Sequence, residues 1–272
     1  RIPSTTIAFP MVHDTLPIIK VRSYLKKPQL PYIRFPKITN IKRNDIVVFN
    51  WPADTVRQFF KKEKGVVKPI DKKSNYVKRC LGLPGDTLEI IDGFVHNNGK
   101  LNTLPERARI QYSYSAYSKK GISSKDLLAS EYKNFNRRFR IQNISENSYN
   151  LLLPYILGSF NDNSNNFLVI TNSSGLPINL IKRLGLRVME IKEIKKNLVL
   201  TTEEYQKLKQ VKWLDSIKRN ITKIRTANES FFPNKIPFNW NQDNFGPIII
   251  PKSRMKINLD LNNLPLYKKI IS

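Results

Sequence analysis

Residues 41–103 consist of short apolar runs separated by dipeptides that favour tight turns. The β-branched run Asp45–Trp51 ends at a proline, which is typical of a buried strand. Farther along, Asp92-Gly93 is a strong signal for a two-residue hairpin turn, and Asn98-Gly99 offers another. Strands this close in sequence pair with their neighbours in antiparallel order. We therefore expect a compact antiparallel β unit, whose other strands are 75–83, 87–91 and 94–96, with a polar, lysine-rich loop at 57–73.

The chain on either side of this unit differs from it in composition and in the secondary structure that it predicts. Residues 1–42 are dense in proline, which favours extended, turn-rich backbone with short strands. Beyond Pro105, helix and strand signals alternate without a repeat, with helices expected at 124–133 and 201–217 and strands at 167–170 and 186–194. The second helix opens with a capping box at Thr201–Glu204. We therefore expect a mainly β protein, with a core segment at 1–104, an inserted α+β subdomain at 105–235 and a return to the core at 236–272.

The charge of the chain raises the question of a nucleic-acid partner. Lysine and arginine number 47 against 21 acidic residues, so the formal net charge is +26. The basic residues are scattered in short clusters, and no zinc-finger spacing or aromatic RNA-binding motif accompanies them. We therefore expect no nucleic-acid partner.

The composition also limits which metal sites and membrane-spanning segments the chain can form. One cysteine and two histidines exclude an internal disulfide and supply few metal ligands, so we expect no metal and no cofactor. The longest apolar run, Leu151–Leu157, is far shorter than the ~20 residues that cross a bilayer. The chain begins with Arg1 and lacks a charged-then-apolar leader. We expect it to be an internal segment of a longer protein.

One strand of the predicted unit carries a lysine in a specific context. A lysine such as Lys78 ordinarily faces solvent in an alternating strand. Here it lies in the string Tyr76-Val77-Lys78-Arg79-Cys80-Leu81-Gly82-Leu83-Pro84-Gly85-Asp86. This string resembles the lysine box of bacterial type I signal peptidases, which are Ser/Lys peptidases of the S26 family. The preceding run Ile41–Phe49 resembles the strand box of that family, and residues 7–17, 50–56 and 240–251 resemble its long-insert, Bacteroidetes-type form.

The resemblance implies a fold, an activity and a set of site residues. The fold is an antiparallel β catalytic core with a large α+β insertion. The activity is that of a serine endopeptidase, signal peptidase I, which removes signal peptides from exported preproteins by cutting after small residues. Lys78 is then the general base. The implied substrate-binding residues are Asp45, Ile46, Val47, Val48, Phe49, Tyr76 and Val77, and the implied structural motif is Arg79, Gly82, Pro84, Gly85 and Asp86.

The resemblance also implies a location and partners. The family acts at the outer, periplasmic face of the bacterial cytoplasmic membrane and is held in the lipid by an N-terminal transmembrane anchor. Its partners are the signal peptides of preproteins, which bind as an added strand. A lysine amine is protonated at neutral pH, so Lys78 can accept a serine proton only where burial disfavours its charge. We expect Val77, Leu81 and Val47–Phe49 to supply that apolar environment.

Two boxes of the family do not occur in these residues. The nucleophile box, Pro-Ser-x-Ser-Met-x-Pro-Thr-Leu, has its nearest counterpart at residues 2–7, where Thr6 takes the position of the nucleophile and Ser4 that of its oxyanion-hole neighbour. Residues 7–10 match better the stretch that follows this box, so we expect the serine upstream of Arg1. The closing box, Gly-Asp-Asn-Arg-x-x-Ser-x-Asp-Ser-Arg, is expected beyond the end of the chain. His13 and His96 are interpreted as surface or turn residues and Cys80 as a small core residue.

Two other hypotheses stay open at this point. The missing serine box favours a non-catalytic homologue that acts as a binding or assembly module. The high positive charge favours a basic nucleic-acid-binding protein, or a self-cleaving repressor of the related Ser/Lys fold, although the motifs are those of a membrane protease.

Overall fold

The structure, a computed structural model, describes residues 6–9, 12, 15–31, 36, 38–50, 68–162, 166–228, 230–233 and 237–271. The chain forms two compact units, of which the first joins Arg1–Pro105 to Ile224–Ser272 and the second is Glu106–Lys223. The units divide at 105/106 and 223/224, whereas the sequence placed the boundaries at 104/105 and 235/236. Every strand pair in the described parts of the chain is antiparallel. The prediction of a mainly β, antiparallel protein is therefore confirmed.

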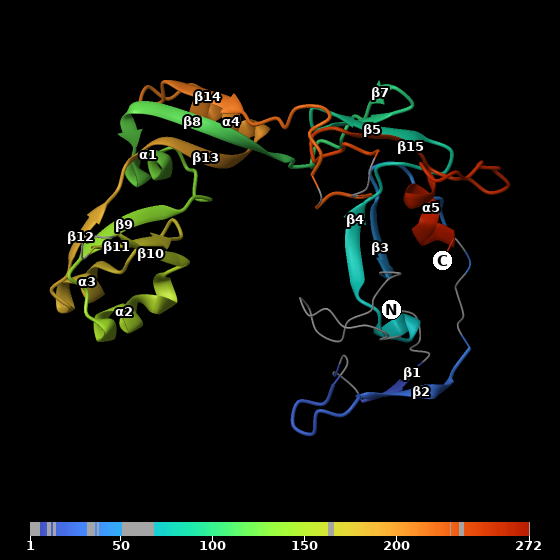
Figure 1. Ribbon diagram of the computed structural model, residues 1–272, viewed down its shortest axis with the longest axis horizontal. Helices are drawn as coiled ribbons and strands as arrows, with labels where there is room; N and C mark the ends of the chain where they lie inside the picture. Colours follow the sequence, from blue (N-terminus) through green and yellow to red (C-terminus); the bar gives the residue numbers. More distant parts are fainter. Residues whose placement is uncertain are drawn as a thin grey trace. The chain divides into compact units, whose positions relative to one another are not determined.

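The first unit contains three sheets within its described residues (Figure 1). Two are single pairs, β1 with β2 and β3 with β4, and the third has the order β15-β5-β6-β7. Because β15 follows the second unit in the chain, residues from both sides of that unit build one sheet. The strands are β1 (Thr6–Ala8), β2 (Tyr24–Gln29), β3 (Ile46–Asn50), β4 (Asn75–Arg79), β5 (Thr87–Ile91), β6 (Phe94–Asn97), β7 (Lys100–Leu101) and β15 (Phe245–Ile249). The helical segments are the 3-10 turn η1 (Ile70–Lys72) and α5 (Leu264–Ile271).

The turns of the four-stranded sheet follow the dipeptides that predicted them. Asp92 and Gly93, between β5 and β6, have φ values of 48° and 77°. Asn98 and Gly99, between β6 and β7, have φ values of 53° and 75°. Positive φ at both central residues is the type I′ geometry, which aspartate, asparagine and glycine adopt at the lowest steric cost. Both predicted hairpins are confirmed.

The strand predicted at Asp45–Trp51 forms, but it is not buried. It is observed as β3, and Trp51 lies outside the described residues. Ile46 and Val48 are each 67% exposed. Among the described residues β3 pairs only with β4, and a two-stranded ribbon by itself covers neither of its faces, so a β-branched run forms a strand here without entering a core. The prediction of a buried strand was therefore wrong. Most of the loop predicted at 57–73 lies outside the described residues.

The second unit contains two sheets, each with its own apolar core. In the first sheet the long strand β8 lies between β13 and β14 (Figure 1), and the second has the order β10-β11-β9-β12. Two helices pack on the core of the first sheet through Leu127 and Leu208, and a third helix packs on the core of the second sheet through Leu152. The strands are β8 (Gln111–Ile122), β9 (Arg137–Gln142), β10 (Gly158–Asp162), β11 (Asn166–Thr171), β12 (Arg187–Glu190), β13 (Glu193–Thr201) and β14 (Ser216–Arg219). The helices are α1 (Ser124–Ala129), α2 (Glu146–Leu152), the 3-10 turn η2 (Leu153–Tyr155), α3 (Ile178–Arg183) and α4 (Thr202–Lys209).

The elements expected in this unit are present with changed limits. The capping box of α4 is confirmed. The Thr201 side chain accepts a hydrogen bond from the backbone N–H of Glu204, and the Glu204 side chain accepts one from the backbone N–H of Thr201. The helix expected at 201–217 ends at Lys209, and its last part is strand β14, whose Ile217 packs on the core of the first sheet. The strand expected at 186–194 is two strands, β12 and β13, in different sheets. Tertiary pairing therefore overrode the local signal at both places.

The described residues include short helices and dispersed metal-ligating side chains. Among them, no helix combines the length and the apolar character needed to cross a bilayer. Nor do the described histidine, cysteine and acidic side chains form a cluster of three that could hold a metal ion.

Candidate active site

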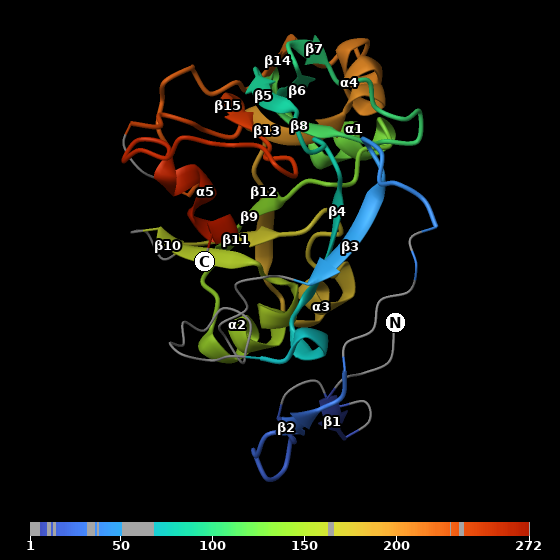
Figure 2. The ribbon, with the colours of Figure 1, turned by 90° about the vertical axis from the view of Figure 1, so that its right-hand side faces the viewer.

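Lys78 lies in β4, which pairs with β3 as a two-stranded ribbon (Figure 2). The register places Val47 opposite Lys78 and Phe49 opposite Tyr76. Residues directly opposite in an antiparallel pair project from the same face, and so do alternate residues of one strand. These four side chains therefore share one face of the ribbon, which we call the lysine face.

Two aromatic rings line the lysine face. The ring centroids of Phe49 and Tyr76 lie 6.3 Å apart, and the ring planes are inclined by 27°. The Nζ atom of Lys78 lies 5.9 Å from the centroid of the Tyr76 ring. An ammonium group at this distance over an aromatic ring is attracted by the negative face of the ring. The amine is therefore held over an aromatic surface in the described residues.

The apolar environment expected around Lys78 is present only on one side. Lys78 itself is exposed. Val48 and Val77 project from the opposite face, where Val77 is 60% exposed, because neighbouring residues of a strand alternate between faces. The expectation that Val48 and Val77 surround the amine was therefore wrong. Val47 and Phe49 are the strand residues that share its face.

The two faces of the ribbon divide the predicted substrate-binding residues. Those on the lysine face are Val47, Phe49 and Tyr76. Those on the opposite face are Ile46, Val48 and Val77. Asp45 precedes β3, and its carboxylate accepts a hydrogen bond from the backbone N–H of Lys42 at 2.7 Å. A chain that lies over Lys78 can therefore contact only the first group directly.

The residues after Lys78 tie β4 to the start of β3. The backbone N–H of Cys80 donates to the carbonyl of Asp45 at 2.8 Å, and the N–H of Asn44 donates to the carbonyl of Cys80 at 2.7 Å. The guanidinium of Arg79 donates to the carbonyl of Asn44 at 2.6 Å. These bonds close the open end of the ribbon, so they help to hold the register that sets Lys78 opposite Val47. The thiol of Cys80 belongs to a half-buried residue.

The proline and glycine of the lysine box form a type II turn. The N–H of Asp86 donates to the carbonyl of Leu83 at 2.9 Å across the turn, and Gly85, its third residue, has a φ of 95°. Proline at the second position and glycine at the third are what this turn requires. The N–H of Gly85 also donates to the carbonyl of Ile250 at 2.7 Å. Gly82 lies so close to the Ile250 side chain that an added Cβ would overlap it.

Replacement of Gly85 by alanine tests this turn. Gly85→Ala is expected to lower the free energy of unfolding of the first unit by about 1–3 kcal/mol, since a Cβ is strained at this φ. Pro84→Ala keeps the geometry accessible and is the matched control, with an expected loss of under about 1 kcal/mol. Urea unfolding of both variants measures the difference. Equal stabilities of the two variants would show that the turn does not require glycine.

Asp86 connects four segments of the first unit. Its carboxylate accepts hydrogen bonds from the Arg43 guanidinium at 2.9 and 2.5 Å, from the Asn98 side-chain amide at 3.0 Å and from the N–H of Leu83 at 2.8 Å. The carbonyl of Asp86 accepts from the N–H of Ile250 at 2.8 Å. One buried residue thus joins the approach to β3, the lysine-box turn, the β6–β7 hairpin and the segment after β15.

These contacts perturb the acidity of Asp86. The hydrogen bonds from Arg43 are the largest cause, and they lower the pKa of the Asp86 carboxyl from 3.8 to about 2. Burial acts in the opposite direction, and the bonds from Leu83 and Asn98 add to the lowering. The carboxylate raises the pKa of Arg43 in return. The pair is therefore ionised throughout the neutral range.

Thr6 is anchored beside the start of β4. It is 4% exposed, and its hydroxyl donates to Asp71 Oδ1 at 2.5 Å while its N–H donates to Oδ2 at 3.2 Å. Asp71 lies in η1, directly before β4. The side chain of Lys72 also donates to the carbonyl of Val12 at 3.3 Å. The first strand is thus fastened to the segment that leads into Lys78, and the Thr6 hydroxyl is engaged with a carboxylate.

The other candidates from the sequence have less bearing on the site. Ser4 and His13 lie outside the described residues. His96 pairs with Leu101 in the β6–β7 hairpin, and its Nδ1 lies 3.0 Å from the carbonyl of Phe94.

Sequence reasoning missed the roles of Arg43, Asp71 and Asn98. Their contacts are not with sequence neighbours, because the partners of Arg43 and Asp71 lie 43 and 65 positions away and that of Asn98 lies 12 positions away. A charged residue in the turn before a strand is a weak signal, because most such residues face solvent.

Comparison with known proteins gives one match. The family described as signal peptidase, peptidase S26, matches residues 10–165, which is more than half of the chain. The matched region contains the β3–β4 ribbon with Lys78, the type II turn and Asp86, and it continues into the second unit. Searches of curated proteins and of solved structures found no match.

Proposed function

Because the chain belongs to the signal peptidase family, peptidase S26, we propose that it is part of a signal peptidase I, with Lys78 as the general base. The observation that carries the proposal is the lysine face: the matched region presents the amine of Lys78 on an open strand ribbon between Val47 and Tyr76. The substrate class is the signal peptide of an exported preprotein. The proposed location is the outer face of the bacterial cytoplasmic membrane, with an N-terminal transmembrane anchor outside these residues.

The chemistry requires the lysine to be neutral when it acts. Neutral Nζ accepts the proton of a serine hydroxyl, the serine oxygen attacks the peptide carbonyl, and the proton passes to the leaving amine. Water then hydrolyses the acyl-enzyme, again with the lysine as the base. The serine is proposed to lie in a segment that precedes Arg1, since no Pro-Ser-x-Ser-Met box occurs in this sequence.

Removal of water from the lysine face is part of this proposal. Lys78 is exposed on the described ribbon, so β3 and β4 alone do not desolvate it. A substrate strand that lies over Val47, Phe49 and Tyr76 would cover the amine and disfavour its charged form. Desolvation would then coincide with substrate binding. The family cuts after small residues, so we propose a small residue at the position before the cut.

A second candidate function is a non-catalytic member of the family. The absence of the serine box from this sequence and the exposure of Lys78 both favour it. In that case the ribbon would bind an extended chain without cutting it.

Cleavage by the full-length protein separates the two candidates. We expect it to cut a purified preprotein that has alanine at the residue before the cleavage site. Phenylalanine at that residue is expected to lower kcat/KM by about 100-fold, because the family cuts after small residues. Mass spectrometry of the released peptide identifies the cut. Binding of the preprotein without any cleavage would support the non-catalytic candidate instead.

A further inference from the structure

Strand β13 is an edge strand of its sheet in the described part of the second unit, with β8 on its other side. The hydroxyl of Tyr132 contacts both backbone groups of Val199 at 3.1 Å, accepting from its N–H and donating to its carbonyl. The backbone of Val199 therefore points away from β8. Backbone direction alternates by two along an antiparallel strand, and the register is regular from Lys195 to Thr201. The N–H and C=O groups of Lys195 and Asn197 therefore point away from β8 as well.

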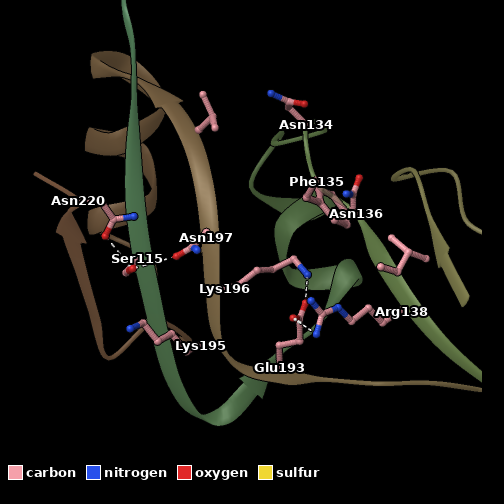
Figure 3. Close-up of a pocket in the computed structure, with 12 residues that line it drawn as sticks. Ser115, Asn134, Phe135, Asn136, Arg138, Glu193, Lys195, Lys196, Asn197 and Asn220 are labelled. Atoms are coloured by element: carbon pink, nitrogen blue, oxygen red, sulfur yellow. Dashed lines mark hydrogen bonds and ion pairs between the residues drawn. The ribbon is translucent and has the colours of Figure 1, made fainter. Parts of the chain in front are cut away.

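A groove of about 760 Å³ runs along this edge (Figure 3). One wall is β13 with Ser115 of β8 and Asn220. The other wall is formed by Asn134 and Asn136 before β9 and by Arg138 at the start of β9. The Ser115 hydroxyl lies 3.0 Å from Asn197 Oδ1 and 2.8 Å from Asn220 Oδ1, so the polar side chains of the first wall hold each other in place. The groove is therefore a concave surface with an ordered polar wall, and it lies beside backbone groups that point away from β8.

Positive charges outnumber negative charges among the side chains that line the groove. Its ionisable side chains are Arg138, Glu193, Lys195 and Lys196. Figure 3 shows Glu193 between Lys196 and Arg138, and it forms an ion pair with each, at 3.2 Å to Arg138. Three cations and one carboxylate thus line the groove, and the carboxylate is already bound to two of the cations, while Lys195 points to the other side of β13. Lysines on an edge strand discourage pairing with neutral or basic strands, but they favour a strand that carries carboxylates.

We propose that the β13 edge binds an extended acidic peptide segment of a partner protein as an additional strand. The backbone of Lys195 and Asn197 supplies the ladder hydrogen bonds, and the Tyr132 hydroxyl ends the ladder at Val199. Lys195, which is exposed, supplies the main attraction for carboxylates on the peptide, and Arg138, whose side chain is 52% exposed, adds to it. This site lies in the second unit and does not depend on the proposed peptidase activity.

The binding test uses the full chain and a fluorescein-labelled hexapeptide of alternating glutamate and valine, followed by fluorescence anisotropy at a fixed salt concentration. We expect saturable binding that Lys195→Glu weakens by about 10-fold or more. Lys212→Glu is the matched control, because Lys212 is exposed in the same unit and lies outside the groove, and it is expected to leave the affinity unchanged. Equal losses of affinity in both variants would show that the peptide responds only to the overall charge of the protein, which would contradict a specific site. Absence of binding to the wild type would overturn the proposal.

Backbone methylation of the peptide tests the strand itself. Two further peptides carry N-methyl groups on all glutamates or on all valines, which removes one alternate set of N–H donors from each. A strand bonded along one edge uses only one of these sets, so one peptide is expected to lose about 10-fold or more in affinity while the other retains it. Equal affinities of the two methylated peptides would overturn strand addition, since a loosely held acidic coil does not distinguish them.

Discussion

Replacement of Lys78 by methionine in the full-length protein is expected to lower preprotein cleavage by about 1,000-fold or more. Loss of a general base typically costs between about 100-fold and 10,000-fold, and methionine retains the length of the side chain without an amine. The expected loss is in kcat, because the amine acts on the proton of the serine and not on the remote parts of the substrate. Single-turnover cleavage of a preprotein measures the rate of the chemical step directly.

The control for this experiment is Lys100→Met in the β6–β7 hairpin. Lys100 is exposed, so its loss is expected to leave cleavage unchanged. Thermal unfolding of both variants should match the wild type, because Lys78 is also exposed and an exposed side chain contributes little to stability. Wild-type cleavage by a folded Lys78→Met protein would remove the lysine from the mechanism and with it the proposed dyad.

Replacement of Asp86 by asparagine is expected to lower the free energy of unfolding of the first unit by about 2 kcal/mol at pH 7. The folded carboxyl has a pKa of about 2 against 3.8 ordinarily, which corresponds to a stabilisation of up to about 2 kcal/mol. Arg43 is 40% exposed on its side chain, so solvent screening keeps the contribution at or below that ceiling. The bonds from Leu83 and Asn98 contribute to the same lowering of the pKa, so this figure already contains their effect.

The contribution of Asp86 to the stability of the fold depends on pH, and its direction follows from the lowered pKa of the carboxyl. A carboxyl whose folded pKa is depressed stabilises the fold above its unfolded value, and that stabilisation disappears as the pH falls from about 4 to about 2. The wild type should therefore lose stability in this window, and Asp86→Asn should lose less. Hydrogen exchange at residues 82–90 reports on the first unit separately from the second. Asp92→Asn, at an exposed hairpin turn, is the matched control and should stay within about 0.5 kcal/mol of the wild type. An unchanged acid profile in Asp86→Asn would show that the Arg43 pair does not stabilise the fold.

Local signals predicted the parts of the fold that depend on a few consecutive residues. The two hairpins, the capping box of α4 and the start of β4 were all predicted from neighbouring positions, because backbone preference acts within one turn of chain, whereas β4 ends at Arg79 and not at Leu83 as expected. The errors occurred where a distant partner decides the outcome. Residues 216–219 carry no signal that separates a helix end from a strand, and they become β14 because β8 offers an edge to them.

The sequence by itself determined the family motif, the candidate base Lys78 and the turn that follows it. Only the tertiary structure decided which residues share a face with that lysine, that Arg43 holds Asp86 across 43 positions, and that β13 presents an edge beside a cationic groove. The reason is physical. Turn and strand preferences are properties of adjacent dihedral angles, whereas a shared face, an ion pair between distant residues and a sheet edge depend on register and on burial between segments that are far apart in the chain.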